Sequence, residues 1–168
     1  GVFTRLGHLP VYFKRETDND SFSVDKDRQA KVTHTVREHL AGGGVLAFCP
    51  EGGINRKDPT NLITFRRGTF QMILELGVPI FGLTMYGNHV FWPPDAKMGG
   101  LPASVVADVF AVEEWNSQIE NAQVDAAGLC EMCERRMQRS LDLCVARAKQ
   151  VGNTASGSAG RASSSKAN

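Results

Sequence analysis

Four short apolar runs, separated by segments with helical periodicity, constrain most strongly what this chain can fold into. The runs cover residues 8–13, 45–49, 79–86 and 104–112, and each has the length of a β-strand. A strand that is followed by a helix and a second strand normally pairs with that strand in parallel, through a right-handed crossover. The first three runs are separated in this way. The sequence therefore predicts an α/β fold with a mostly parallel sheet and flanking helices.

The helix expected between the first two runs has signals at both ends. Its apolar residues Val32, Val36 and Leu40 recur at every fourth position, which places them on one helix face. Ser23 is a candidate N-cap, and the glycines at 42–44 favour an end to the helix there. The helix expected between the second and third runs ends in the same way, at a glycine that precedes a proline.

The C-terminal part of the chain has a simpler pattern. From about residue 119 to 151 the spacing is helical, and the Gly-, Ser- and Ala-rich residues 152–168 have no hydrophobic face. Such a tail cannot offset its ordering entropy, so we expect it to be disordered. The predicted division is an α/β part at 1–115, a C-terminal helix at 116–151 and a disordered tail at 152–168.

The composition excludes several classes of protein. Of the 168 residues, 42% are apolar and 22% are charged, and the formal net charge is only +1. A chain balanced in this way has no overall attraction for nucleic acid, and we expect no nucleic-acid partner. No run of about 18 uncharged apolar residues occurs, so no segment of the chain is expected to span a bilayer.

The cysteines of "CEMC", Cys130 and Cys133, raise the question of a zinc site. Such a site needs a second pair of ligands, and the only later cysteine, Cys144, has no His nearby. Cys133 and Cys144 also fall on an apolar stripe with spacings of three and four. The stripe consists of Leu129, Cys133, Met137, Leu141, Cys144 and Ala148. We therefore expect these cysteines to pack in a core, and we expect no metal.

The run at 45–49 ends in a turn that can bind an anion. Pro50 interrupts strand pairing, and Gly52 and Gly53 permit positive φ, so backbone N–H groups can point toward a ligand. Arg15 follows the first run and His89 follows the third, and in a parallel sheet both would reach the same edge. The sequence thus predicts one anion-binding crevice that is formed by separate parts of the chain.

Basic side chains are concentrated around this turn. A guanidinium group suits a phosphate, and each charge-assisted hydrogen bond contributes about 1.5–3 kcal/mol. The basic residues are Arg56, Lys57, Arg66 and Arg67, and the acids among them are Glu51 and Asp58. A basic pair is more often a solvated face, and a Gly-Gly pair is more often only a turn. The expected convergence at one sheet edge is what favours a binding site.

Three blocks of this sequence occur in the order of a known enzyme family. They are "VYFKR" at 11–15, "FCPEGGINR" at 48–56 and "VPI" at 78–80. In this order they resemble the glycerolipid acyltransferase family, whose members make phosphatidic acid from lysophosphatidic acid and acyl-CoA. The segment "FRRGTF" at 65–70 also resembles the start of the family's next helix. The resemblance covers roughly residues 1–115, and three ordered blocks are more specific than the P-E-G tripeptide alone.

The resemblance implies roles for individual residues. Arg15 and the loop from Glu51 to Arg56 would hold the phosphate and glycerol of the acceptor, and Pro79 would shape the acyl side of the site. The substrate-binding residues predicted in this way are Arg15, Glu51, Gly52, Gly53, Asn55, Arg56, Arg67 and Pro79. The chain departs from the family pattern at three of its positions. Cys49 replaces an aromatic residue, Gly53 replaces a Thr, and Arg56 comes two positions late.

The resemblance also implies the reaction and its setting. The substrates would be acyl-CoA and lysophosphatidic acid or a related lysophospholipid, in phospholipid biosynthesis. No cofactor is expected, because a thioester is already activated. Since the acceptor is a lipid, the parent protein would work at a membrane surface, which in a eukaryote is usually the endoplasmic reticulum.

The family's catalytic pair is not found in this chain. That pair has the form H-x-x-x-x-D, in which the His takes the proton of the acceptor hydroxyl and the Asp orients the His. Five positions after His8, His34, His39 and His89 stand Phe13, His39, Gly44 and Pro94. The chain begins almost at its "VYFKR" block, and the family has the pair upstream of that block. We therefore interpret the chain as an incomplete acyltransferase that has no catalytic residue and is inactive by itself.

Two alternatives come from other classes of protein. The chain can instead be a non-catalytic relative of the acyltransferases that binds anionic lipid or phosphate. A P-loop nucleotide enzyme is disfavoured, because no G-x-x-x-x-G-K-[ST] motif occurs.

Overall fold

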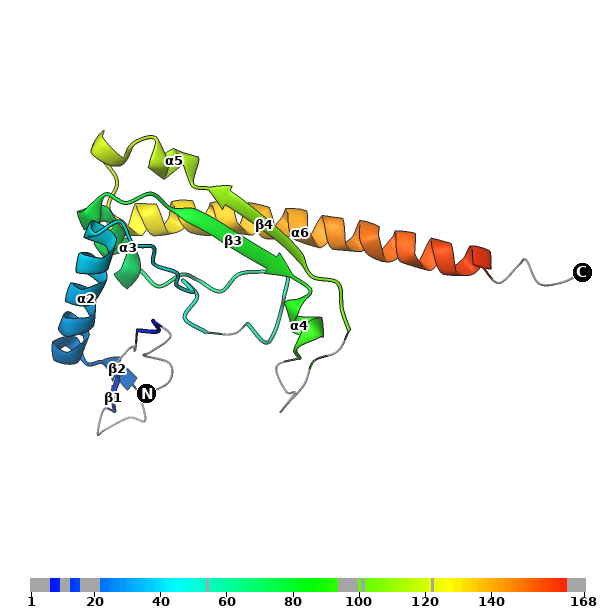
Figure 1. The fold of residues 1–168 in the computed structure, drawn as a ribbon, viewed down its shortest axis with the longest axis horizontal. Coiled ribbons are helices and arrows are strands. Elements are labelled where there is room, and N and C mark those ends of the chain that lie inside the picture. The colour runs from blue at the N-terminus through cyan, green and yellow to red at the C-terminus, as the bar shows by residue number, and fades with distance from the viewer. Residues whose placement is uncertain are drawn as a thin grey trace, which may run out of the picture. The chain divides into compact units, whose positions relative to one another are not determined.

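The structure of the protein is a computed structural model, shown in Figure 1. It divides into two compact units, Gly1–Phe48 and Cys49–Asn168, and each is described by itself. The described residues are 7–9, 13–15, 22–53, 55–93, 100, 102–121 and 123–162. Both units contain helix and strand, so the mixed content predicted from the sequence is confirmed.

The first unit contains a short hairpin and a helix. Strand β1 (Phe13–Arg15) pairs antiparallel with β2 (Phe22–Val24). Helix α2 (Lys26–Ala41) follows, and the side chain of its N-cap, Asp25, accepts a hydrogen bond from the Arg28 N–H at 3.2 Å. The expected cap Ser23 lies within β2 instead. The helix ends at Gly42, as the glycines at 42–44 predicted.

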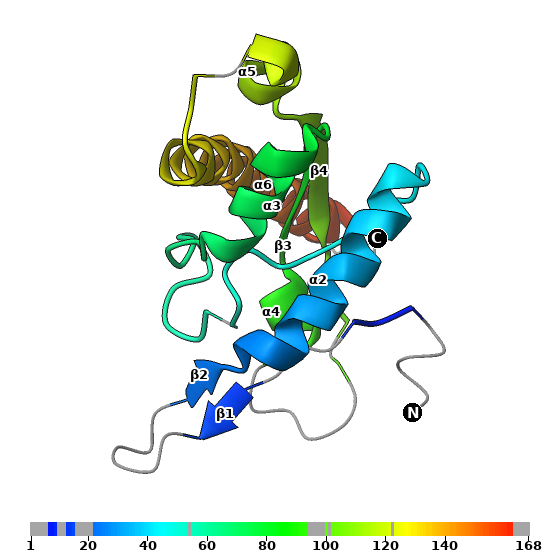
Figure 2. The same cartoon turned by 90° about the vertical axis from the view of Figure 1, so that its left-hand side faces the viewer.

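The second unit is built on a sheet of two strands covered on one face by a long helix. Strand β3 (Phe81–Tyr86) pairs antiparallel with β4 (Val106–Ala111), with Phe81 opposite Ala111. Helix α6 (Ala126–Ala162) runs along one face of this sheet, as both views show (Figures 1 and 2). The other elements are α3 (Gly68–Leu76), α4 (Asn88–Phe91), α5 (Glu113–Asn116) and the 3-10 helix η1 (Ile119–Asn121).

Helix α3 has the boundaries that its sequence predicts. It ends at Gly77, which adopts the left-handed conformation with φ of 56° and whose N–H donates to the carbonyl oxygen of Ile73 at 2.9 Å. Only glycine takes this conformation at little cost. The buried face of the helix carries Phe70 and Ile73.

The mostly parallel sheet is not found among the described residues. Both strand pairings there are antiparallel, and the run at 45–49 forms no strand. Val45 is 86% exposed, and its carbonyl oxygen accepts a hydrogen bond from Nε2 of His39 at 3.1 Å. An apolar run forms a strand only where its backbone N–H and C=O groups pair with a neighbouring strand. Here the carbonyl group of Val45 is bound by the His39 side chain instead.

The other expected strands are found in part. The runs at 79–86 and 104–112 contain β3 and β4, whereas in the run at 8–13 only Phe13 is in a described strand, and residues 10–12 lie outside the described residues.

The core of the second unit lies where α3, α5 and α6 meet the strands. Trp115 is 1% exposed, and its indole Nε1–H donates to the carbonyl oxygen of Val78 at 2.8 Å. The cluster contains Phe65, Phe70, Ile73, Phe110, Val112, Trp115, Leu129, Cys130 and Cys133. Leu129, Cys133, Leu141 and Cys144 of the predicted stripe are buried, which confirms the spacing argument for α6.

The cysteines of α6 are part of this packing. Burial is the main cause that raises the pKa of the Cys133 thiol to about 12, so the thiol stays protonated near neutral pH. Burial also raises the pKa of Cys130. Among the described residues, no three His, Cys, Asp or Glu side chains are placed to share a metal ion.

Helix α6 continues to Ala162, past the expected end at 151. The division into parts at 1–115, 116–151 and 152–168 stays a prediction. None of the helices in the described part of the chain has the length and apolar content needed to cross a bilayer.

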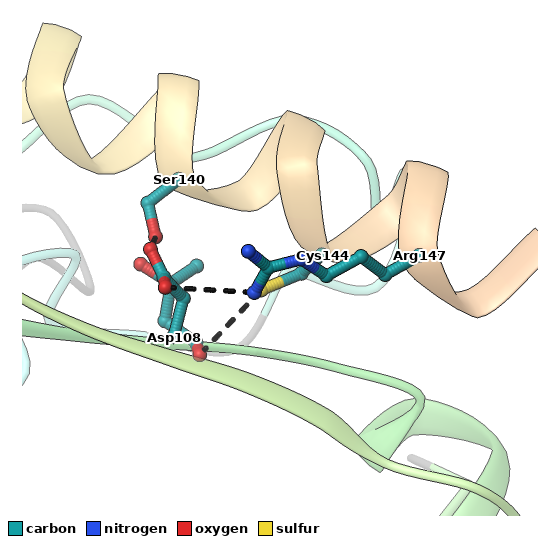
Figure 3. Close-up of polar contacts among 5 residues, drawn as sticks. Asp108, Ser140, Cys144 and Arg147 are labelled. Atoms are coloured by element: carbon teal, nitrogen blue, oxygen red, sulfur yellow. Dashed lines mark hydrogen bonds and ion pairs between the residues drawn. The ribbon is translucent and has the colours of Figure 1, made fainter.

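A polar contact lies between β4 and α6 (Figure 3). The Ser140 hydroxyl donates to Oδ2 of Asp108 at 2.7 Å, and Nη1 of Arg147 lies 3.7 Å from Oδ1 of the same carboxylate. Ser140 is fully buried, whereas the Arg147 side chain is 56% exposed. The two contacts of Asp108 therefore differ in their environment, and their contributions to stability should differ.

We expect Asp108→Ala to lower the free energy of unfolding by about 1–3 kcal/mol, because it leaves the buried Ser140 hydroxyl without its acceptor. Arg147→Ala removes only the long, exposed ion pair and should cost less than about 0.5 kcal/mol. Urea unfolding followed by circular dichroism measures both changes. Equal losses in the two variants would contradict the assignment of the stabilising contact to Ser140.

Candidate functional site

The glycine turn lies in a loop, residues 50–66, whose ends are joined by hydrogen bonds. The Arg66 N–H donates to the carbonyl oxygen of Pro50 at 2.9 Å. Next to this contact, Oε2 of Glu51 accepts from the Ile63 N–H at 2.8 Å. We call residues 50–66 the closed loop. Glu51, a predicted substrate-binding residue, therefore has a structural contact of its own.

The middle of the closed loop is held by Asn55 and Asp58. The side-chain amide of Asn55 donates to the carbonyl oxygens of Asp58 and Asn61, both at 2.7 Å, and its Oδ1 accepts from the N–H groups of Lys57 and Asp58. Both ends of the Asn55 side chain are thus used within the loop. These contacts support the shape of the loop, and the predicted role of Asn55 in binding substrate stays a prediction.

Asp58 completes this inner set of contacts. Its Oδ1 accepts from the N–H and the hydroxyl of Thr60, at 2.8 and 2.6 Å. The hydroxyl contact is the largest cause that holds the pKa of the Asp58 carboxyl below its usual value, followed by the backbone contact. The carboxylate is therefore ionised at neutral pH, and its charge is used within the loop.

Two side chains of α6, Gln138 and Glu134, form hydrogen bonds with the closed loop. The amide of Gln138 accepts from the Leu62 N–H and donates to the Thr60 carbonyl oxygen, both at 3.0 Å. Oε2 of Glu134 accepts from the N–H of Phe65 at 3.1 Å. Since Phe65 is also buried, the segment that leads into Arg66 is fixed by both packing and hydrogen bonds.

The turn itself places Arg66 against Gly52. Gly52 has φ of +62°, and its N–H donates to the Cys49 carbonyl oxygen at 3.1 Å. A Cβ atom built on Gly52 would overlap Nε of Arg66, so the end of the Arg66 side chain occupies the space that the glycine leaves open. Any other residue at position 52 would displace Arg66 as well as strain the backbone.

Sequence reasoning selected Arg67 of the pair Arg66–Arg67, but Arg66 is the residue at the turn. Arg67 is the N-cap residue of α3, and its charge lies close enough to Cys130 to lower the pKa of that thiol against the larger effect of burial. The basic pair was the signal in the sequence. It could not tell which of the two side chains lies at Gly52.

The remaining predicted residues have separate positions. Gly53 and Arg56 are exposed in the closed loop. Arg15 ends β1 in the first unit, and its side chain lies outside what the structure describes. The predicted meeting of Arg15 with the glycine turn therefore stays a prediction.

Pro79 is exposed, but the backbone of both neighbouring residues forms hydrogen bonds with side chains of α5. Trp115 donates to the carbonyl oxygen of Val78. The Asn116 side chain accepts from the Ile80 N–H at 2.8 Å and donates to the Ile80 carbonyl oxygen at 2.9 Å. The short helix α5 thereby fixes the backbone on both sides of Pro79.

The side chains of His89 and Cys49 are of types that can act as a base or as a nucleophile. The His89 ring packs against Tyr86 with the ring centroids 5.1 Å apart, and its Nδ1 is buried without a hydrogen-bond partner among the described residues. Cys49 is exposed, and its carbonyl oxygen closes the turn at Gly52. The described contacts provide neither residue with the oriented partner that an acid–base or nucleophilic role requires.

Comparison with known proteins identifies the family. Residues 2–86, about half of the chain, match the family model described as Acyltransferase. The matched region contains the "VYFKR" block, the glycine turn and Arg66. The chain belongs to the acyltransferase family. Neither the curated proteins nor the solved structures gave a match to it.

Proposed function

We propose that this chain contributes the acceptor-binding part of an enzyme that transfers a fatty acyl group from acyl-CoA to the hydroxyl of lysophosphatidic acid or a related lysophospholipid. The observation that carries the proposal is the acyltransferase match over residues 2–86, which includes Arg15, Glu51 and the glycine turn. The closed loop supports it, because it holds a glycine turn and a guanidinium group together at an exposed position.

In the proposed reaction the closed loop and Arg15 hold the phosphate and glycerol of the acceptor, and Pro79 shapes the acyl side. The acceptor hydroxyl attacks the thioester carbonyl, a C–O bond forms, the C–S bond breaks, and the hydroxyl proton passes through a base to the CoA thiolate. No cofactor is needed, because the thioester is already activated. We place the reaction at a membrane surface, in a eukaryote that of the endoplasmic reticulum, because acceptor and product are lipids.

In this proposal the histidines of the chain do not act as the base for the reaction. None of its four His residues has an Asp five positions later, and the contacts described for His89 include no carboxylate. We therefore propose that the 168 residues bind the acceptor but do not turn it over. The second candidate, a non-catalytic relative that binds anionic lipid or phosphate, is favoured by this same observation and differs in needing no base from elsewhere.

An acyl-transfer assay separates the two candidates. We expect the chain alone to bind lysophosphatidic acid without consuming labelled acyl-CoA. We expect transfer when a segment with the family's H-x-x-x-x-D pair is fused before Gly1, a fusion that we call the upstream-extended protein. Appearance of labelled phosphatidic acid measures the reaction. Binding without transfer in both preparations would support the non-catalytic candidate. Transfer by the chain alone would show that the base has been assigned wrongly.

A further inference from the structure

We infer that Arg66, together with the backbone N–H of Gly53, is the group that recognises the phosphate of the acceptor and sets the preference for a phosphorylated over a neutral acceptor. This inference rests on the proposed function and assigns one part of its site to one side chain. It is carried by the position of the Arg66 side chain on Gly52 and by the hydrogen-bonding groups that this arrangement leaves open.

The backbone of Arg66 is fixed at the turn. Its N–H donates to the Pro50 carbonyl oxygen at 2.9 Å, and the preceding residue, Phe65, is buried with its own N–H bound to Glu134. A side chain that starts from a fixed backbone loses less conformational freedom when it binds a ligand than one on a mobile loop. Arg66 is therefore already placed at the turn.

The end of the Arg66 side chain lies over Gly52. A Cβ atom on Gly52 would overlap Nε of Arg66 and would lie 2.7 Å from Cδ and 3.0 Å from Cζ. The guanidinium end of the side chain thus lies at the glycine, while the residue as a whole remains exposed. The glycine leaves the space that this packing requires, which gives position 52 a role beyond the turn itself.

The guanidinium group has open donors. Within the described part of the chain, no carboxylate or carbonyl group forms a hydrogen bond or an ion pair with the side chain of Arg66. The nearest acid in sequence, Glu51, has one oxygen bound to the Ile63 N–H. An exposed guanidinium group with unoccupied N–H donors suits a phosphate, which offers several acceptor oxygens in the matching geometry.

The two glycine amides at the turn differ in whether they have a hydrogen-bond partner. The N–H of Gly52 is used by the Cys49 carbonyl oxygen, whereas the N–H of Gly53 has no hydrogen-bond partner among the described residues. Nothing lies within 4 Å of a Cβ built on Gly53, so this side of the turn is open. The open amide follows directly on the glycine that Arg66 covers, and a bound oxyanion can accept from both groups.

Arg139 provides a matched control for this inference. It has the same charge as Arg66 and is also exposed, and it lies on α6 in the same unit. It is not among the residues that were predicted to bind substrate. A variant at position 139 therefore changes the net charge equally without removing the donor at Gly52.

Binding of small phosphates tests the inference without acyl transfer. Isothermal titration with sn-glycerol 3-phosphate and with inorganic phosphate should show that Arg66→Gln raises the Kd for both by about tenfold or more, the size of one lost charge-assisted contact. Arg139→Gln should change the Kd by less than about twofold, as expected for an exposed charge without direct contact. Glycerol serves as the neutral ligand, and its weak binding should be the same in all three proteins.

Gly52→Ala is the second variant. The added methyl group should displace Arg66 and raise the Kd in the same sense, and a melting curve shows whether the domain is still folded. Equal losses of phosphate affinity for Arg66→Gln and Arg139→Gln would overturn the inference. So would an unchanged Kd in Arg66→Gln, or the absence of phosphate binding by the wild-type chain. Dependence of phosphate binding on Arg66 with no acyl transfer by the upstream-extended protein would sustain the inference and refute the proposed function. Acyl transfer with an unchanged KM for lysophosphatidic acid in Arg66→Gln would support the proposed function and refute the inference about Arg66.

Discussion

Trp115→Ala is expected to lower the free energy of unfolding by about 3–5 kcal/mol, the largest effect of a single substitution that we predict for this chain. Trp115 is 1% exposed and is among the largest fully buried side chains of the core. Its removal leaves a cavity between α3, α5 and α6, and the carbonyl oxygen of Val78 loses its donor. The cavity and the lost hydrogen bond both destabilise the folded state.

The other tryptophan provides the control. Trp92 is 52% exposed, so Trp92→Ala should change the free energy of unfolding by less than about 0.5 kcal/mol. Urea titrations followed by far-ultraviolet circular dichroism suit this comparison, because fluorescence would change with the loss of either residue. Trp115→Phe keeps most of the volume and separates the cavity from the hydrogen bond. Similar losses at positions 92 and 115 would show that the core has been placed wrongly.

Trp115→Ala also has a consequence for the candidate site. Trp115 and its neighbour Asn116 together fix the backbone at Val78 and Ile80, on either side of Pro79. If Pro79 shapes the acyl side, Trp115→Ala should disturb that side more than the closed loop, whose contacts run to Gln138 and Glu134.

Local sequence signals predicted α2, α3 and the buried stripe of α6, but not the short helices α4 and α5. The left-handed Gly77 ends α3, and the three- and four-residue spacing around Cys133 describes which face of α6 is buried. Such features depend on residues within a turn or two of each other. The parallel sheet is not found among the described residues, because strand pairing depends on a distant partner. In the apolar run at 45–49, one carbonyl group is bound by His39 instead.

The site could be predicted to a similar extent. Pro50 and the two glycines indicated a turn with open amides, and the open amide is that of Gly53. The sequence could not show that Arg66, and not Arg67, lies at Gly52, because the segment before Arg66 is held by a hydrogen bond between Phe65 and Glu134, which are far apart in the chain. The predicted role of Arg67 in binding substrate stays a prediction. Asn55 was predicted as a ligand because it stands in the motif, and its contacts within the loop have no signature in the sequence.

Glu51→Ala is expected to reduce acyl transfer by the upstream-extended protein about 10- to 100-fold, the equivalent of roughly 1.5–3 kcal/mol. Oε2 of Glu51 accepts from the Ile63 N–H and so helps to hold the closed loop in the form that places Arg66 on Gly52. The contact with Ile63 is exposed, so the free energy of unfolding should fall by no more than about 1 kcal/mol. Activity should therefore be lost from a domain that is still folded.

Glu51→Gln distinguishes the two roles that Glu51 can have. A glutamine keeps an oxygen acceptor for the Ile63 N–H but carries no charge, so a loop-closing role predicts activity within about threefold of the wild type, since a neutral acceptor forms a weaker bond. A role in which the carboxylate itself contacts the acceptor hydroxyl predicts that Gln is as damaging as Ala. Because one carboxylate oxygen already has a backbone partner, we expect the first result. Equal loss in both variants, with unchanged melting curves, would move Glu51 from holding the loop to binding the substrate.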